Sequence, residues 1–369
     1  MAYSTGFQDK TAELLTKTEI VAGVQHPMEA LADPYPVEHD DRPFGYISAL
    51  ELLQKQLQHE SETGWKLACL PRIYKVTEVK IEENGDAAMA DGDSSVPKHA
   101  FPSLAVPTTV SPGHKPIYPE TYFSIYAEQD IETVPKMNNI AASLIRDTIA
   151  DTINVLDFNR NAVAKFLIEL DCFFAPGTFA ARGTAFDKIR DIPAGQPTWK
   201  PEDMVVDAIF AQMLLLPSAE HKLVFYHSVI TESRKLAPAA IAPTLGRAIR
   251  YLYRSIDYMD LELAYRFLDW FSHHLSNFDF RWKWAEWTED VDSSAVSMKK
   301  AFIVAAIDKE IRLSFTKRIR ETLPKEYHKL IPTGKEKDVP DFKFNNPGKS
   351  IHIYQNVKSL TCHRHAICD

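Results

Sequence analysis

The segment Trp270–Trp287 concentrates the side chains of this chain that could do chemistry. It reads WFSHHLSNFDFRWKWAEW and holds seven aromatic rings, four of them tryptophan, and two adjacent histidines. Aromatic rings flanked by basic residues can stack on nucleic-acid bases, and a sandwich of rings would suit a methylated guanine cation. The same rings can instead close a core between helices, where each buries ~150–250 Å². We favour the core, because large aromatic side chains are mostly buried. The residues singled out are Trp270, His273, His274, Phe278, Phe280, Arg281, Trp282, Trp284 and Trp287.

The adjacent histidines do not form a metal-binding pair. Neighbouring positions on a helix point about 100° apart, so His273 and His274 cannot share a metal as an i, i+4 pair would. His274 falls beside Phe271 and Leu275 on the apolar stripe, which favours a hydrogen-bonded core histidine, and His273 is a candidate surface contact. We expect no catalytic residue here, since the nearby nucleophiles are ordinary serines.

Two motifs near the C-terminus resemble binding sites but do not fit them. Gly348-Lys-Ser350 lacks the first glycine of a phosphate-binding loop, because Lys343 stands at that position. Cys362-His-Arg-His-Ala-Ile-Cys368 places four candidate zinc ligands within seven residues, whereas zinc modules usually bracket a folded loop. We therefore predict no metal and no cofactor.

Composition limits the class of protein. The 369 residues are 45% hydrophobic, enough for a sizeable core, and the net charge of −8 argues against a broad nucleic-acid surface. Four cysteines are too few for a disulfide framework, which favours a reducing compartment. We see no signal peptide and no apolar run long enough for a membrane span, so a soluble intracellular protein is expected.

Hydrophobic periodicity predicts helices along most of the chain. Amphipathic segments are expected over 49–57 and 137–157. A further helix, capped by Asn159 or Asn161, is expected to carry the apolar residues between 163 and 170. Pro201 suits a first helical position, with Glu202 and Asp203 in the first turn. Ser218 and Asp260 are predicted to cap two further helices, and Pro238 and Pro243 mark the start of another between them. A last helix is expected over 297–322. The alternating run 278–284 is interpreted as an extended connection leading into a short helix. Short helices with short connections predict stacked helical hairpins.

Several segments together resemble the large subunit of nuclear cap-binding complexes, of fungal type. They are the tryptophan-rich run, Arg266–Trp270, Phe210–Pro217 and Tyr251–Asp257 with Met259. The resemblance covers about 116–324 and, more faintly, 43–71. It implies an all-α, HEAT-like helical-hairpin (α-solenoid) domain of the initiation-factor-four-gamma middle-domain type.

Four regions are expected. Residues 1–75 are interpreted as the remnant of a first helical domain whose helix at residue 49 has nothing to pack on when taken alone. Six acidic residues between 76 and 93 and six prolines between 97 and 119 predict a linker over 76–134. The middle domain follows over 135–325. The rest, 326–369, is a linker and an aberrant tail, of which 348–369 is a candidate translated intron, because Gly-Lys-Ser can be encoded across a splice-donor consensus.

The resemblance implies a non-enzymatic nuclear scaffold that can shuttle to the cytoplasm. Its expected partner is a small cap-binding subunit, in a heterodimer. Capped RNA is reached indirectly, and splicing, export and decay factors bind the surface. The excess of basic residues between Lys317 and Lys358 would allow a weak RNA or acidic-partner surface. Three alternatives stay open: a cytoplasmic translation-initiation scaffold of the same fold, a hydrolase using His273 or His274, and an inactive fragment.

Overall fold

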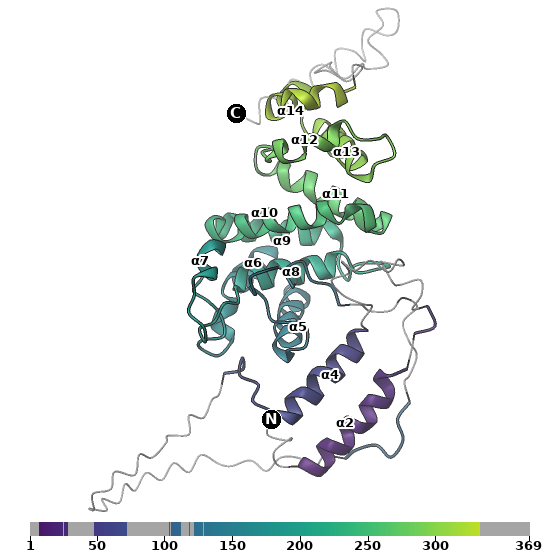
Figure 1. Cartoon of the computed structure of the whole chain (residues 1–369), viewed down its shortest axis with the longest axis vertical. Helices are drawn as coiled ribbons and strands as arrows, with labels where there is room; N and C mark the ends of the chain where they lie inside the picture. Colours follow the sequence, from purple (N-terminus) through teal and green to yellow (C-terminus); the bar gives the residue numbers. More distant parts are fainter. Residues whose placement is uncertain are drawn as a thin grey trace, which may run out of the picture. The chain divides into compact units, whose positions relative to one another are not determined.

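The computed structural model describes residues 7–24, 26–28, 48–71, 103, 105–111, 118, 122–127 and 129–332. These residues form α-helices and short 3₁₀ helices joined by turns, with no strand among them, which confirms the all-α prediction (Figure 1). The chain divides into two compact units, the first ending at His274 and the second beginning at Leu275, within helix α11 (Leu261–Ser276). None of the described helices is long and apolar enough to cross a membrane.

Three interpreted segments lie outside the described residues: the acidic stretch 76–93, Gly348–Ser350 and Cys362–Cys368. The predictions made for them stay predictions. The same holds for most of the proline-rich stretch and for the chain beyond residue 332.

Two N-terminal helices pack together, which corrects the expectation for residue 49. Helix α4 (Ala49–Glu62) contacts helices α2 (Gln8–Ala22) and α5 (Ile140–Val155). The sequence gives no clear hydrophobic pattern that predicts α2. The buried face of α4 carries Leu52 and two glutamines. Gln54 accepts a hydrogen bond from Thr18 Oγ1 of α2 at 2.8 Å, and Gln56 Nε2 donates to Met137 O, just before α5, at 2.7 Å. The predicted apolar face is not the buried one, because Leu50 is 57% exposed.

The next helices stack in pairs. Helix α5 packs on α6 (Arg160–Ile168), and α8 (Pro201–Met213) packs on α9 (Leu223–Leu236). Across the two pairs, α5 contacts α8 and α6 contacts α9, and α10 (Pro238–Arg254) then packs on both α8 and α9. A short helix, α7 (Phe186–Arg190), lies in the connection between the pairs. Equivalent helices of successive pairs therefore lie against one another, as in a helical-hairpin solenoid.

Helix starts follow the cap signals in most cases. Asn159 accepts hydrogen bonds from the backbone N–H groups of residues 161 and 162, and Asp260 accepts from Glu262 N, so both predicted caps are confirmed. Pro201 is the first residue of α8, also as predicted. The cap predicted at Ser218 is wrong: α9 begins only at Leu223, after Lys222, whose side chain makes no cap bond. Pro243 lies inside α10 instead of at its start.

The second unit contains α12 (Thr288–Val291), α13 (Met298–Leu313) and α14 (Thr316–Thr322), followed by a 3₁₀ helix, Lys325–Leu330. The single helix predicted over 297–322 is wrong, because the backbone is extended at Phe315 (φ −154°, ψ 156°). The break has a packing reason. It lets α14 fold against α13 and bury Ile319, whereas one straight helix of that span would run ~39 Å.

Helix α8 is the centre of the first unit. Eleven of its thirteen residues are buried, including Asp203 and Asp207, one helical turn apart. Asp207 pairs with Arg146 of α5 and accepts hydrogen bonds from Ser124 Oγ at 3.0 Å and Ile125 N at 2.6 Å. Burial raises the pKa of Asp207, and Arg146 only partly offsets this. The carboxylate thus fixes the stretch 122–127 and α5 against α8.

Asp203 makes the matching contact on the other side. It pairs with Arg247 of α10 and accepts a hydrogen bond from Thr244 Oγ1 at 2.8 Å. The Arg247 guanidinium lies over the Tyr126 ring, 4.9 Å from its centroid, and Tyr126 donates its hydroxyl to Thr244 O at 2.9 Å. The two acids of α8 therefore hold α5, α10 and the segment 122–127 in place.

We expect Asp207→Ala to lower the free energy of unfolding by about 3–5 kcal/mol, because it leaves the Arg146 guanidinium buried without its partner. The matched control is Asp171→Ala, which removes the exposed pair with Arg182 and should cost less than about 1 kcal/mol. Urea unfolding followed by far-UV circular dichroism measures both. Equal losses in the two variants would contradict the anchoring of α8.

Candidate functional site

Within the first unit, the structure brings together two of the segments that carried the resemblance. Trp270 of α11 is fully buried, and its ring meets Phe210 of α8 edge to face, with centroids 4.7 Å apart. Arg266, one turn earlier, donates to the carbonyl oxygens of Leu215 at 2.8 Å and Pro217 at 2.7 Å. These carbonyls follow the C-terminus of α8, where backbone acceptors lack helical partners. The guanidinium thus closes the end of the central helix.

The two histidines take different positions in the first unit. His274 is buried, stacks on Trp270 with centroids 5.0 Å apart, and its Nε2 meets Arg234 Nη1 at 2.6 Å. Burial, followed by the Arg234 charge, lowers the pKa of His274 to about 3, so the ring is neutral at physiological pH. His273 is half-buried, with its ring 5.3 Å from that of His227. A neutral, buried imidazole held by an arginine suits packing better than proton transfer.

The second unit begins with a turn that was not predicted. Phe280 donates its N–H to Leu275 O at 2.8 Å, a helix-ending bond of the Schellman type, and Asp279 and Phe280 both have left-handed backbones (φ 58° and 56°). Such a backbone is costly for a bulky residue. Burial of the Phe280 ring and the Arg318 guanidinium 5.3 Å from its centroid offset that cost.

After this turn, the connection and the short helix follow as expected. Residues 281–283 have no regular structure, and a 3₁₀ helix covers Trp284–Trp287. Trp284 and Trp287 are buried edge to face with centroids 5.7 Å apart, and Trp282 lies half-buried 5.3 Å from Trp287. Of the nine residues singled out, Arg281 is exposed, Phe278, His273 and Trp282 are half-buried, and the other five are buried: Trp270, His274, Phe280, Trp284 and Trp287.

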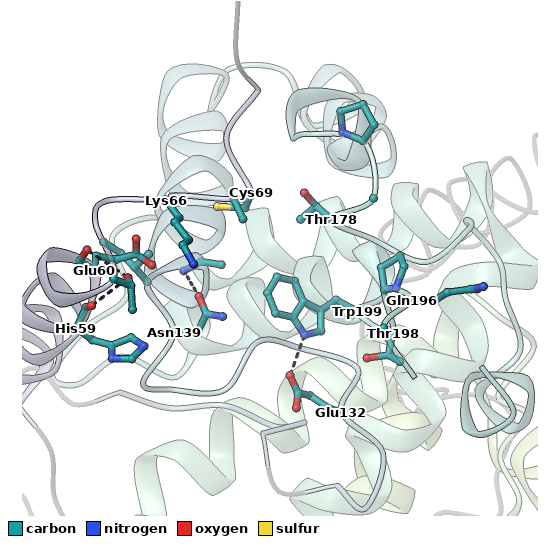
Figure 2. A pocket seen from close by; sticks show the side chains of 18 residues that line it. His59, Glu60, Lys66, Cys69, Glu132, Asn139, Thr178, Gln196, Thr198 and Trp199 are labelled. Atoms are coloured by element: carbon teal, nitrogen blue, oxygen red, sulfur yellow. Dashed lines mark hydrogen bonds between the residues drawn. The ribbon is translucent and has the colours of Figure 1, made fainter. Parts of the chain in front are cut away.

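A pocket of about 720 Å³ opens in the first unit, away from this segment (Figure 2). One wall is the end of α4 and the loop after it, with Glu60, Lys66 and Cys69. The other comes from the loops around Gly177 and Gly195. Trp199 stands in the middle of the view, and its indole Nε1 donates to Glu132 Oε1 at 3.0 Å.

The Trp199 pocket was not predicted. Its walls come from stretches far apart in sequence, and a single Trp in a proline- and glycine-containing loop gives little signal. Across the described residues, no group of three or more His, Cys, Asp or Glu side chains could hold a metal ion.

The fold can now be assigned to a class. Residues 135–325 match the family model described as "MIF4G like", which covers more than half of the chain. The chain therefore belongs to the MIF4G-like family, and the resemblance read from its aromatic segments is confirmed.

Three relatives carry one name in slightly different forms. The chain is 32% identical over 97% of its length to nuclear cap-binding protein subunit 1 of Schizosaccharomyces pombe, and spans 44% of that protein. It is 34% identical over 58% of its length to nuclear cap-binding protein complex subunit 1 of Saccharomyces cerevisiae, spanning 26% of it. To the human nuclear cap-binding protein subunit 1 it is 37% identical over 35% of its length, spanning 16% of it. The chain thus spans less than half of each of these relatives.

We expect Arg266→Lys to lower the free energy of unfolding by roughly 1–3 kcal/mol, because a single ammonium cannot reach the carbonyls that the guanidinium spans. The matched control is Arg254→Lys on exposed surface, which should change stability by less than about 0.5 kcal/mol. Urea unfolding of both variants distinguishes them. The closure of α8 by Arg266 is refuted if the lysine variant matches the wild type.

Glu310 of α13 makes the stability of the chain depend on pH. Its side chain is fully buried, and neither carboxylate oxygen has a hydrogen-bond partner in the described residues. Burial raises the pKa of Glu310 from 4.5 to about 8. Between these values the folded state keeps a proton that the unfolded chain releases, so stability is lost as pH rises from about 4.5 to about 8.

We expect Glu310→Gln to stabilise the chain increasingly as pH rises through this window, by up to about 1.4 kcal/mol per pH unit. The exposed Glu289→Gln is the matched control and should show no such trend. Thermal unfolding midpoints measured at intervals from pH 4.5 to 8.5 test this. A constant difference between Glu310→Gln and the wild type across that range would show that Glu310 is ionised in the folded chain.

Proposed function

We propose that this chain acts as a scaffold subunit of a nuclear cap-binding complex. In this role it would not bind the 7-methylguanosine cap itself, but would support a small RNA-recognition subunit that does. The observation that carries the proposal is 32% identity over 97% of the chain to a protein named nuclear cap-binding protein subunit 1. The match to the MIF4G-like family over 135–325 supports the same assignment.

The distribution of aromatic side chains supports a scaffold over a direct cap binder. A cap site needs aromatic faces open to the ligand, whereas Trp270, Trp284 and Trp287 are buried against other rings. The net charge of −8 also favours RNA contact through a partner over a broad RNA surface on this chain. A rigid helical scaffold can raise the apparent cap affinity of a partner by stabilising its binding-competent conformation.

The finer parts of the assignment belong to the same proposal. We place the chain in the nucleus, with 135–325 as the middle helical domain. The segment before it, predicted as a linker over 76–134, packs on that domain at 122–127, where Ile125 and Tyr126 are buried. The surface of that domain would also receive RNA-processing and export factors, and no membrane partner is proposed. The names of the relatives support the nuclear placement, and the other parts rest on the resemblance of the sequence segments.

The decisive experiment is co-purification on a cap resin. The 369-residue chain is mixed with a small cap-binding subunit from a related fungus and passed over immobilised 7-methylguanosine cap. We expect the chain to be retained only when the small subunit is present, and free cap analogue, but not unmethylated GTP, to release both. Analysis of the eluate by mass spectrometry gives their ratio, with one of each expected.

Two other outcomes would contradict the proposal. Retention of the chain without the small subunit would mean that it binds the cap itself. Elution of the small subunit alone, with a folded chain in the flow-through, would show that this chain does not dock it. Binding of the same preparation to a translation-initiation helicase would then test the alternative, a cytoplasmic translation-initiation scaffold.

A further inference from the structure

We propose that the pocket around Trp199 is a docking site for an arginine side chain of a partner protein. The site lies wholly in the first unit and stands independently of the cap-binding assignment. Three features carry the inference: a half-buried tryptophan ring that is held in place and lines the pocket, a carboxylate at the ring edge, and pocket loops with open space at two glycines.

The Trp199 ring is fixed before any ligand arrives. Its backbone carbonyl accepts a hydrogen bond from Ala180 N at 2.8 Å, and the next residue, Lys200, donates its N–H to Thr133 O at 2.7 Å. The indole N–H is held by Glu132. A ring pinned at backbone and side chain loses little freedom on binding, and this pre-organisation favours affinity.

The Trp199 ring has no aromatic or cationic partner within the described part of the chain. The tryptophans of the aromatic segment, such as Trp270 and Trp284, pack against other rings, but Trp199 makes no aromatic or cation contact there. The side chain is half-buried and lines an open pocket (Figure 2). A tryptophan face is the best protein surface for a cation, worth about 0.5–2 kcal/mol.

Glu132 gives this face its preference for positive charge. One carboxylate oxygen holds the indole, and the other lies 3.8 Å from Lys136 Nζ in an ion pair whose side chains are 41% and 72% exposed. Such an exposed pair is weak, so a better cation can displace the lysine. A planar guanidinium can stack on the indole and hydrogen-bond the carboxylate at the same time, which favours arginine over lysine.

The loops beside the ring leave room for a peptide. Gly177 (φ 85°) and Gly195 (φ 91°) adopt left-handed backbones, and a Cβ added at either would meet nothing within 4 Å. Thr178, Gln196 and Thr198 line the same cavity and offer polar groups to a peptide backbone. On the α4 side the pocket is lined by Glu60, Lys66 and His59, whereas Glu132 is the acidic residue beside Trp199.

The test uses the 369-residue chain and three fluorescein-labelled peptides, Gly-Ser-Xaa-Gly-Xaa-Ser-Gly, with arginine, lysine or citrulline at Xaa. Citrulline keeps the shape of arginine and removes its charge. We expect anisotropy titrations to give the tightest binding for arginine, weaker binding for lysine, and at least tenfold weaker binding for citrulline. Trp199→Ala should weaken arginine binding at least tenfold.

Two variants separate the site from general charge attraction. Glu132→Gln keeps a carbonyl oxygen for the indole N–H but removes the negative charge, so we expect a three- to tenfold loss for the arginine peptide. Asp151→Asn, an exposed acid on α5, makes the same charge change elsewhere and should leave binding unchanged. Thermal unfolding midpoints confirm that each variant folds.

The proposal is overturned if the arginine and citrulline peptides bind equally, or if Glu132→Gln and Asp151→Asn weaken binding to the same extent. It is also overturned if none of the peptides binds the folded wild type. A labelled uridine oligonucleotide serves as a competitor probe. If it binds with the Trp199 dependence expected for the peptide while the peptides do not, the ring is a base-stacking surface instead.

Discussion

The first unit depends on two carboxylates placed inside its core. Asp203 and Asp207 stand one turn apart on α8, a helix buried almost all round, and an isolated charge there would cost several kcal/mol. Each therefore requires a cation from a neighbour, Arg247 of α10 and Arg146 of α5. Hydrophobic contacts tolerate sliding between helices, whereas these pairs require one register. We infer that the acids of α8 select the arrangement in which the helical pairs stack.

The end of the same helix imposes a second requirement. Backbone carbonyls beyond α8 need donors, and Arg266 supplies them from α11 while Trp270, on the next turn, packs against Phe210. The stretches 210–217 and 266–270, which both carried the family resemblance, therefore form one contact in the structure. In the second unit, burial of the Phe280 ring allows a strained turn that a sequence pattern of period two cannot reveal.

Structural features that are set by neighbouring residues could be predicted from the sequence, whereas features that depend on residues far along the chain could not. Asn159 and Asp260 mark helix starts because a cap acts over one turn, and Pro201 does so because its fixed φ suits the first helical position. The break at Phe315 was missed because packing of Ile319 decides it, and α2 was missed because it meets α4 partly through polar groups such as Thr18. The Trp199 pocket was missed for the same reason: its walls come from residues 59–69, 132–141 and 176–199.

Tryptophan in this chain shows why density of a residue type is a poor guide to a binding site. Within the first unit Trp270 packs against Phe210, and within the second Trp284 packs against Trp287. Burial removes these rings from contact with a ligand. Trp199 lies in a connecting loop between Gly195 and α8, where backbone bonds and Glu132 hold it in place and its half-buried side chain lines a pocket. Rigid scaffolds commonly carry their recognition residues on such loops. The aromatic segment therefore identifies the fold, while the isolated ring is the better place to look for a partner.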